Sequence, residues 1–293
     1  MIEPRLNHVQ CLDPRGLHRM AYWEWGDAAN PRVLVCVHGL SRQGRDFDTL
    51  ARGLLPDYRV ICPDVVGRGR SDRLADPMGY SIPSYVADMV TLLARLDAGE
   101  LHWLGTSMGG LIGLGLAALP HSPVRRLVLN DVGPAIEPDA IARIGSYLGA
   151  PLQWPTLEAA ADYLWSISQS FGPHTREQWL ALTRPMLVRV NGSDDSAGFK
   201  PHYDPAIAVP FRAMTPALAA AGTAALWRAY DAVSCPTLLL RGADSDLLSK
   251  DTALAMTQRG PKALLREFAG VGHAPTLIAD DQVAAVQEFL RSS

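Results

Sequence analysis

Residues 105–109 form the pattern Gly-x-Ser-x-Gly, with Ser107 at its centre. An apolar segment, 101–104, comes directly before the pattern, and a segment with helical periodicity, 111–119, follows it. A serine at a sharp turn from a strand to a helix is held in a strained backbone conformation, and small flanking residues leave room for the turn. The free N–H groups at the helix start favour negative charge there. The pattern therefore predicts that Ser107 is a nucleophile.

A serine nucleophile needs a general base, and His273 is the candidate. It lies between Gly272 and Ala274, on a predicted loop after the strand-like segment 263–268. A histidine between small residues on a loop can reach the end of another strand. The other seven histidines lack such a setting. We therefore expect His273 to take the proton of Ser107.

Three aspartates are candidates for the acid that orients His273. Asp244 and Asp246 lie on the loop after the apolar segment 237–240, and Asp131 closes the apolar segment that ends at residue 130. All three come between the serine and the histidine, which is the chain order Ser, Asp, His. A carboxylate in this place would fix the tautomer of the imidazole and stabilise its charged form.

The negative oxygen formed during acyl transfer also needs hydrogen-bond donors. Met108, the residue after the nucleophile, is expected to supply one backbone N–H group. Leu40, on the loop after the first core strand, is expected to supply the other. One such donor is typically worth about 10² to 10³ in turnover.

The elements that position these residues indicate an α/β fold. Short apolar segments bounded by glycine, proline or charge occur at 33–37, 60–62, 101–104, 127–129 and 237–240. Continuous apolarity suits strands that are buried on both faces, as in a parallel sheet. Helical periodicity occurs at 82–96, with Ser81 as a predicted N-cap, and at 282–290. The strand, helix and strand within 101–130 predict a crossover connection.

The chain from residue 134 to residue 234 differs in composition from the rest. It has no clear strand run, prolines interrupt its helical segments, and it holds four of the seven tryptophans. We predict that 134–234 is a helical cap inserted into an α/β core made of residues 1–133 and 235–293. Within the cap, the small polar run 191–198 predicts a mobile loop.

Composition and charge exclude several classes of function. The 293 residues are 48% hydrophobic and carry a net charge of −3, with no run of five like charges, so a basic nucleic-acid surface is not expected. The stretch most like a membrane span, 103–119, is uncharged, but it contains five glycines and is too short to span a bilayer. The N-terminal residues carry no secretory pattern. Four widely spaced cysteines match neither a zinc site nor a disulfide scaffold, so a cytoplasmic location is expected.

Together these motifs resemble those of the α/β-hydrolase superfamily, in the branch with a helical cap. The matching features are His38-Gly39, residues 64–71 (DVVGRGRS), the turn at 105–110, the loop 242–246 and Gly272-His273. The resemblance implies an eight-stranded, mostly parallel sheet, an active site between core and cap, and no metal or organic cofactor. Related loops usually place the acid just before an apolar pair and the next helix, which favours Asp246 over Asp244 and Asp131.

The type of nucleophile narrows the expected chemistry. Relatives that open epoxides or remove halide carry aspartate where this chain has Ser107. Serine members most often hydrolyse carboxylic esters, so we predict a serine carboxylesterase that acts through an acyl-enzyme on a small ester with an apolar moiety. Hydrolysis of carbon–carbon bonds in ring-fission products is an alternative, although those relatives usually carry Asn in place of Thr106. Lactones, thioesters and a non-enzymatic ligand receptor are further alternatives.

A dinucleotide-binding oxidoreductase is also an alternative, because Gly113, Gly115 and Ala118 fit the pattern G-x-G-x-x-A. That motif requires Gly113 to lie where a strand ends and a helix begins. The predicted strand ends at Gly105 instead, which puts Gly113 inside the helix. Close packing of helix against sheet explains these glycines equally well.

Overall fold

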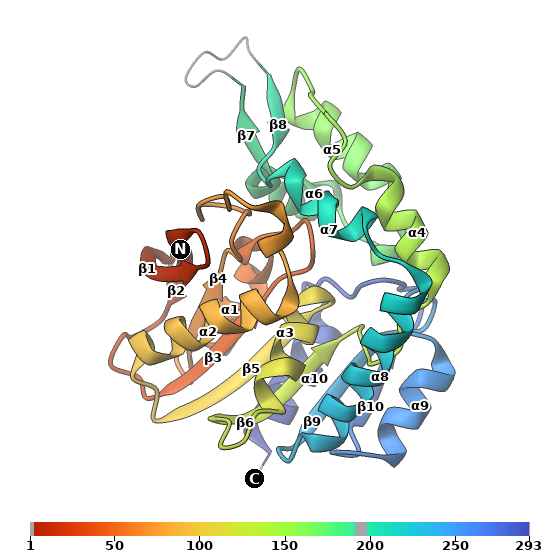
Figure 1. Ribbon diagram of the computed structural model, residues 1–293. Helices are drawn as coiled ribbons and strands as arrows, with labels where there is room; N and C mark the ends of the chain where they lie inside the picture. Colours follow the sequence, from red (N-terminus) through yellow and green to blue (C-terminus); the bar gives the residue numbers. More distant parts are fainter. Residues whose placement is uncertain (1–2, 191–197, 293) are drawn as a thin grey trace.

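An eight-stranded sheet forms the centre of the computed structural model, which describes residues 3–190 and 198–292 (Figure 1). The strands lie in the order β1-β2-β4-β3-β5-β6-β9-β10. β2 pairs antiparallel with β1 and with β4, and the other neighbours are parallel. The predicted α/β fold with a mostly parallel sheet is confirmed. The strands are β1 (Arg5–Asp13), β2 (Gly16–Trp25), β3 (Arg32–Val37), β4 (Arg59–Pro63), β5 (Glu100–Thr106), β6 (Val124–Asn130), β9 (Thr237–Gly242) and β10 (Leu264–Phe268).

Helices cover both faces of the sheet, because the central strands bury side chains on both sides. Along β3, Val33, Val35 and Val37 pack into the cluster closed by α2, α3 and α8. Leu34 and Cys36 pack into the cluster closed by α1 and α10. This alternation follows from the two-residue period of a strand and explains the continuous apolar runs. The helices are α1 (Asp48–Leu54), α2 (Ile82–Leu96), α3 (Met108–Ala117), α8 (Pro216–Ala232), α9 (Lys250–Gln258) and α10 (Asp280–Arg291).

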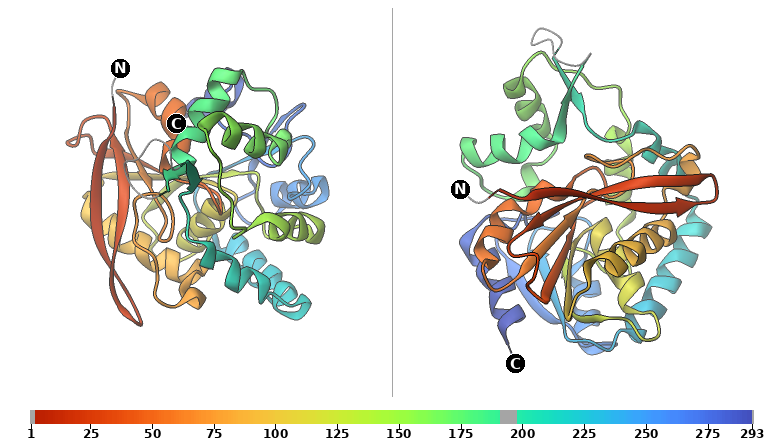
Figure 2. Two further views of the ribbon diagram at one scale, coloured as in Figure 1. Left: turned by 90° about the horizontal axis from the view of Figure 1, so that it is seen from above. Right: turned by 90° about the vertical axis from the view of Figure 1, so that its left-hand side faces the viewer.

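The segment between β6 and α8 forms a separate layer over one end of the sheet (Figures 1 and 2). It contains a small antiparallel pair of strands, β7 and β8, which the sequence pattern did not predict. α8 falls within the predicted cap range 134–234, but it packs against α3 and so belongs with the core layer. Apart from Gly198, the predicted polar loop 191–198 lies outside the described residues. The elements of this layer are α4 (Pro138–Tyr147), α5 (Leu157–Ser166), α6 (Arg176–Thr183), β7 (Leu187–Arg189), β8 (Phe199–Pro201) and α7 (Ala208–Arg212).

A long hairpin of β1 and β2 forms one edge of the sheet (Figure 2). In β1, the more buried residues alternate with exposed ones, and only Val9 and Cys11 are buried. His18 on β2 joins the hairpin to α2, because its Nε2 lies 3.1 Å from Oδ2 of Asp88. The outer strand of the hairpin, β1, therefore forms the edge of the sheet with only one face buried, and its sequence is not a continuous apolar run.

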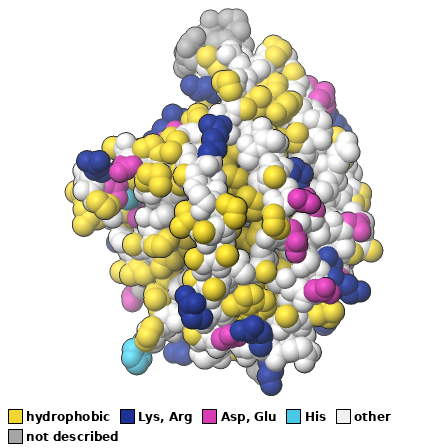
Figure 3. Space-filling model, turned by 45° about the vertical axis from the view of Figure 1, so that its right-hand side comes forward, with side chains coloured by type: hydrophobic (Ala, Val, Ile, Leu, Met, Phe, Trp, Pro, Cys, Tyr) yellow, Lys and Arg dark blue, Asp and Glu magenta, His cyan; other side chains and the backbone are white. Residues whose placement is uncertain are grey.

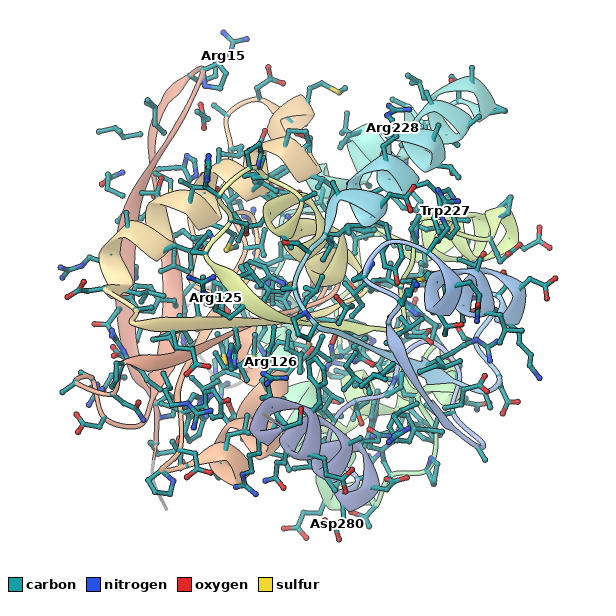
Figure 4. The ribbon with its side chains drawn as sticks, turned by 90° about the horizontal axis from the view of Figure 1, so that it is seen from below. Arg15, Arg125, Arg126, Trp227, Arg228 and Asp280 are labelled. Atoms are coloured by element: carbon teal, nitrogen blue, oxygen red, sulfur yellow. The ribbon has the colours of Figure 1, made fainter. Side chains whose placement is uncertain are left out.

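α10 packs with α1 on one face of the sheet. Arg126 on β6 lies beside this helix and donates a hydrogen bond of 3.2 Å to the carbonyl oxygen of Phe289 (Figure 4).

On the face drawn in Figure 3, side chains of both charges lie among apolar and neutral ones. Within residues 3–190 and 198–292, no helix combines the length and apolar character needed to cross a bilayer.

Gly113 lies inside α3, where the helix approaches the sheet closely. A Cβ atom at this position would lie 2.2 Å from Nε1 of Trp103, whose side chain is completely buried. Close packing therefore accounts for Gly113, and its place within a helix does not fit a dinucleotide-binding turn.

We expect the substitution Gly113→Ala to lower the free energy of unfolding by about 1–3 kcal/mol, because the added methyl group overlaps the buried indole. Gly222 on α8 is a matched control, since nothing lies within 4 Å of its Cβ position. Gly222→Ala should raise stability by about 0.5–1 kcal/mol through helix propensity. Urea unfolding followed by circular dichroism measures both, and a Gly113→Ala protein as stable as the wild type would contradict this packing.

Candidate active site

Ser107 occupies the turn between β5 and α3, in a backbone conformation with φ 53° and ψ −117°. A positive φ is rare for residues other than glycine and indicates local strain. A Cβ atom at Gly105 would lie 2.1 Å from the carbonyl oxygen of Gly109, and one at Gly109 would lie 2.0 Å from that of Val37. Neither position can hold a side chain. The pattern Gly-x-Ser-x-Gly is therefore a steric requirement of this turn.

The structure brings the Ser107 hydroxyl, the His273 ring and the carboxylate of Asp131 into one hydrogen-bonded chain. Nε2 of His273 lies 3.0 Å from Oγ of Ser107. Nδ1 of the same ring lies 2.7 Å from Oδ2 of Asp131. A carboxylate cannot donate, so we assign the ring proton to Nδ1, which leaves Nε2 free to accept the serine proton.

The expectation that Asp246 contacts His273 is wrong, because Asp131 takes that place. Asp131 directly follows β6 and is completely buried, whereas the side chain of Asp246 is 44% exposed and pairs with Arg143 at 2.7 Å. The loop after β9 turns its donors toward Asp131: the Gly242 N–H group lies 2.9 Å from Oδ1 and the Ser245 hydroxyl 2.6 Å from Oδ2. The other candidate on this loop, Asp244, is exposed. The loop thus donates hydrogen bonds to Asp131 and supplies no carboxylate to His273.

Asn130, the last residue of β6, ties the serine turn to the histidine loop. Its Nδ2 donates to Oγ1 of Thr106 at 2.9 Å and to the carbonyl oxygen of Pro275 at 2.8 Å. The side chain is fully buried. Sequence reasoning missed this residue, although its place beside Asp131 at a strand end was a signal.

His38 fixes the loop after β3, next to the serine. Its Nε2 accepts the Val65 N–H at 2.9 Å, and its Nδ1 donates to the carbonyl oxygen of Gly39 at 2.7 Å. Burial lowers the pKa of His38 well below its ordinary value, which keeps the ring neutral and able to accept. His38 therefore has a structural role in shaping the loop that carries Leu40.

Arg68 links the two residues that were predicted to donate to the oxyanion. It is almost completely buried, its Nε donates to the carbonyl oxygen of Leu40 at 2.9 Å, and its guanidinium lies 3.6 Å from Sδ of Met108. Arg68 belongs to the run 64–71 that was recognised in the sequence, but its role there was not predicted. Met108 begins α3, where the first N–H groups have no partner within the helix.

An open pocket lies beside Ser107, between the core and the overlying layer. It encloses about 720 Å³ of empty space, part of it open to solvent. Leu40, Ser107 and His273 line it from the core, and Ile144 and Met186 line it from the other side. A neighbouring apolar pocket shares part of this wall and continues toward Leu152, Trp154, Leu187 and Tyr203.

His202, directly after β8, fastens the overlying layer to the loops of the core. Its Nδ1 accepts the Gly69 N–H at 2.7 Å, and its Nε2 donates to the carbonyl oxygen of Ser41 at 3.1 Å. Nearby, the Tyr80 hydroxyl donates to Asp204 at 2.6 Å. Because Ser41 also lines the pocket, His202 helps to set the pocket's shape.

Among the described residues, Cys11, His18 and Asp88 are the group whose ligand atoms lie close enough to share a metal ion. His18 already pairs with Asp88 at 3.1 Å and lies 3.3 Å from Asp13. None of these residues lines the pocket at Ser107. The cluster is explained as the link between the hairpin and α2.

Comparisons with known proteins agree with this architecture. A family model described as alpha/beta hydrolase fold matches residues 32–279. The chain is 57% identical, over 98% of its length and 97% of the relative's, to a protein of Cupriavidus necator named 3-hydroxybutyrate-oligomer hydrolase. Two solved structures are similar over 99% of both chains: a putative hydrolase from Rickettsia typhi, with TM-score 0.87 and 29% identity, and an alpha/beta hydrolase from Novosphingobium aromaticivorans, with TM-score 0.85 and 35% identity.

We expect His202 to make stability depend on pH. Burial lowers its pKa from 6.5 to about 3, so between these values the unfolded chain binds a proton that the folded chain does not. Stability is therefore lost as the pH falls, by up to about 1.4 kcal/mol per pH unit from this residue. Asp64 acts with the opposite sign, because burial raises its pKa from 3.8 to about 6 and stability is gained as the pH falls through that range.

The substitution His202→Gln should consequently reduce the loss of stability between pH 6.5 and pH 4, although the variant is less stable at pH 7. Asp64→Asn should have the opposite effect and increase the loss of stability as the pH falls. Urea unfolding at a series of pH values measures both slopes. A His202→Gln protein with the wild-type slope would show that His202 does not stay neutral in the fold.

Proposed function

Because the chain belongs to the alpha/beta hydrolase fold family, we propose that it is a serine hydrolase that cleaves carboxylic esters through an acyl-enzyme. The observation that carries this proposal is the series of hydrogen bonds from Ser107 through His273 to Asp131. Ser107, at one end of the series, lines a pocket. A serine hydroxyl is a weak nucleophile until an adjacent base takes its proton. Asp131 is the acid in this proposal.

The proposed reaction proceeds in two halves. Ser107 Oγ attacks the ester carbonyl carbon while His273 Nε2 takes its proton, and Asp131 stabilises the imidazolium that forms. His273 then returns the proton to the departing alcohol, which leaves the acyl group on Ser107. A water molecule, deprotonated by His273, releases the acid and restores the serine. Nucleophile, base and acid all come from the chain itself.

The oxyanion would be held by the backbone N–H groups of Met108 and Leu40. Both residues belong to segments that Arg68 connects, so the two donors are fixed before substrate binds. Donors aimed in advance at the developing charge need no reorganisation during the reaction. The start of α3 adds a favourable dipole at the same point.

We propose short oligomers of 3-hydroxybutyrate as the substrate class. The identity of 57% to a protein with that named activity, over nearly the full length of both chains, supports this assignment. Such oligomers are small chains of esters with methyl branches. The apolar side chains of Ile144, Ile167 and Met186, and the further pocket toward Trp154, suit them.

We expect the protein to hydrolyse dimers and trimers of 3-hydroxybutyrate and Ser107→Ala to lower turnover by at least about 10⁴-fold, because the acyl-enzyme cannot form. Titration of the released acid measures the rate. The same hydrolysis assay is applied to a lactone, a thioester and a ring-fission dienoate. Faster turnover of the dienoate than of every ester, or full activity of Ser107→Ala, would contradict the proposal.

The assignment of the acid is tested separately with an activated short-chain ester. Asp131→Asn should lower kcat by about 10³–10⁴-fold, because an amide neither selects the right imidazole tautomer nor stabilises its charge. Asp244→Asn and Asp246→Asn are the matched controls and should keep kcat within a few-fold of the wild type. If Asp246→Asn lost as much activity as Asp131→Asn, the acid would have been assigned wrongly.

A further inference from the structure

Two guanidinium groups stand in the otherwise uncharged wall of the pocket at Ser107. Among the described residues that line it, Arg42 and Arg143 carry positive charge, and there is no carboxylate. Each arginine is held from outside the lining by a bidentate aspartate, Asp46 for Arg42 and Asp246 for Arg143. A neutral ester needs no such charge, so the arrangement favours an ester that also carries an anion.

Arg42 is a fixed part of the wall. Its distances to Asp46 are 2.6 and 2.7 Å, and both side chains are only about one-sixth exposed (15% and 16%). Removing one partner from a buried ion pair is strongly unfavourable, because the remaining charge stays unpaired. Arg42 therefore cannot readily exchange Asp46 for a ligand.

Arg143 is paired differently. Its distances to Asp246 are 2.7 and 3.0 Å, but the two side chains are 36% and 44% exposed. Water and salt screen such a pair, so it contributes little and is easily exchanged. The planar guanidinium offers the same two-fold hydrogen bonding to any carboxylate that reaches it. Asp246, once displaced, remains in contact with solvent.

We propose that Arg143 binds the free terminal carboxylate of an oligoester acid, and that Asp246 occupies the guanidinium until substrate arrives. This inference rests on the proposed function, since it places the anionic end of the same substrate. Exchange of one carboxylate for another keeps the hydrogen bonds of the guanidinium satisfied. Tyr147, one turn further along α4, lines the pocket beside Arg143 and interacts with the guanidinium. The enzyme thus distinguishes free oligomer acids from esters whose end is capped.

The test compares the dimer of 3-hydroxybutyrate with its methyl ester, which keeps the inner ester and lacks the charge. Cleavage of the inner ester alone is followed, as release of methyl 3-hydroxybutyrate from the methyl ester and of 3-hydroxybutyrate from the acid. In the wild type, kcat/KM should be higher for the free acid. Arg143→Gln should lower the ratio of acid to methyl ester at least tenfold, mainly through KM, and Arg143→Lys should restore it only in part. Asp246→Asn should raise the ratio, because the competing carboxylate is gone.

Arg176→Gln is the matched control. Arg176 also forms an exposed pair, with Asp162 at 2.6 Å, but it does not line the pocket, so the ratio should stay at its wild-type value. An Arg143→Gln protein whose ratio is unchanged, or that loses both substrates equally, overturns the inference while the proposed function stands. A wild-type protein that hydrolyses neither substrate overturns the proposed function and this inference with it.

Discussion

The sharp reversal of the chain between β5 and α3 is the constraint on which the rest of the site depends. It brings three backbone segments so close that Gly105 and Gly109 admit no side chain, and it forces Ser107 to a positive φ. Two hydrogen bonds hold the turn: Ser107 N–H donates to the carbonyl oxygen of Asn130 at 3.0 Å, and Gly110 N–H donates to that of Ser107 at 2.8 Å. The strain is tolerated because the surrounding sheet fixes both ends, and it leaves the hydroxyl facing His273.

Where interactions are local or strongly apolar, the sequence was enough to predict structure. The strands β3, β5 and β9 are buried on both faces and appear as largely apolar runs. α2 begins and ends where its periodicity and the Ser81 cap predict. The turn at Ser107 could be predicted because every residue it requires lies within five positions. The β1–β2 hairpin was not predicted, because β1, at the edge, alternates buried and exposed residues, and because charged side chains interrupt the mostly buried β2.

Where several similar residues could make the same contact between distant segments, the sequence could not decide which of them does. Asp131, Asp244 and Asp246 all satisfy the required chain order, and the choice depends on where Gly242 and Ser245 direct their donors. The same holds for α8, whose composition resembles that of the predicted cap but which packs against α3. The sequence therefore indicated Asp246 as the residue that orients His273. In the structure Asp246 instead pairs with Arg143, which lines the pocket.

The central claim is that Ser107 is a nucleophile activated by His273, and covalent labelling with a fluorophosphonate tests it most directly. Intact mass and peptide mapping should find one adduct per chain, on Ser107. In a His273→Ala variant that keeps its fold, labelling should slow by about 10²–10⁴-fold, since the base no longer takes the proton. An adduct on another residue, or labelling of His273→Ala at the wild-type rate, would contradict the account.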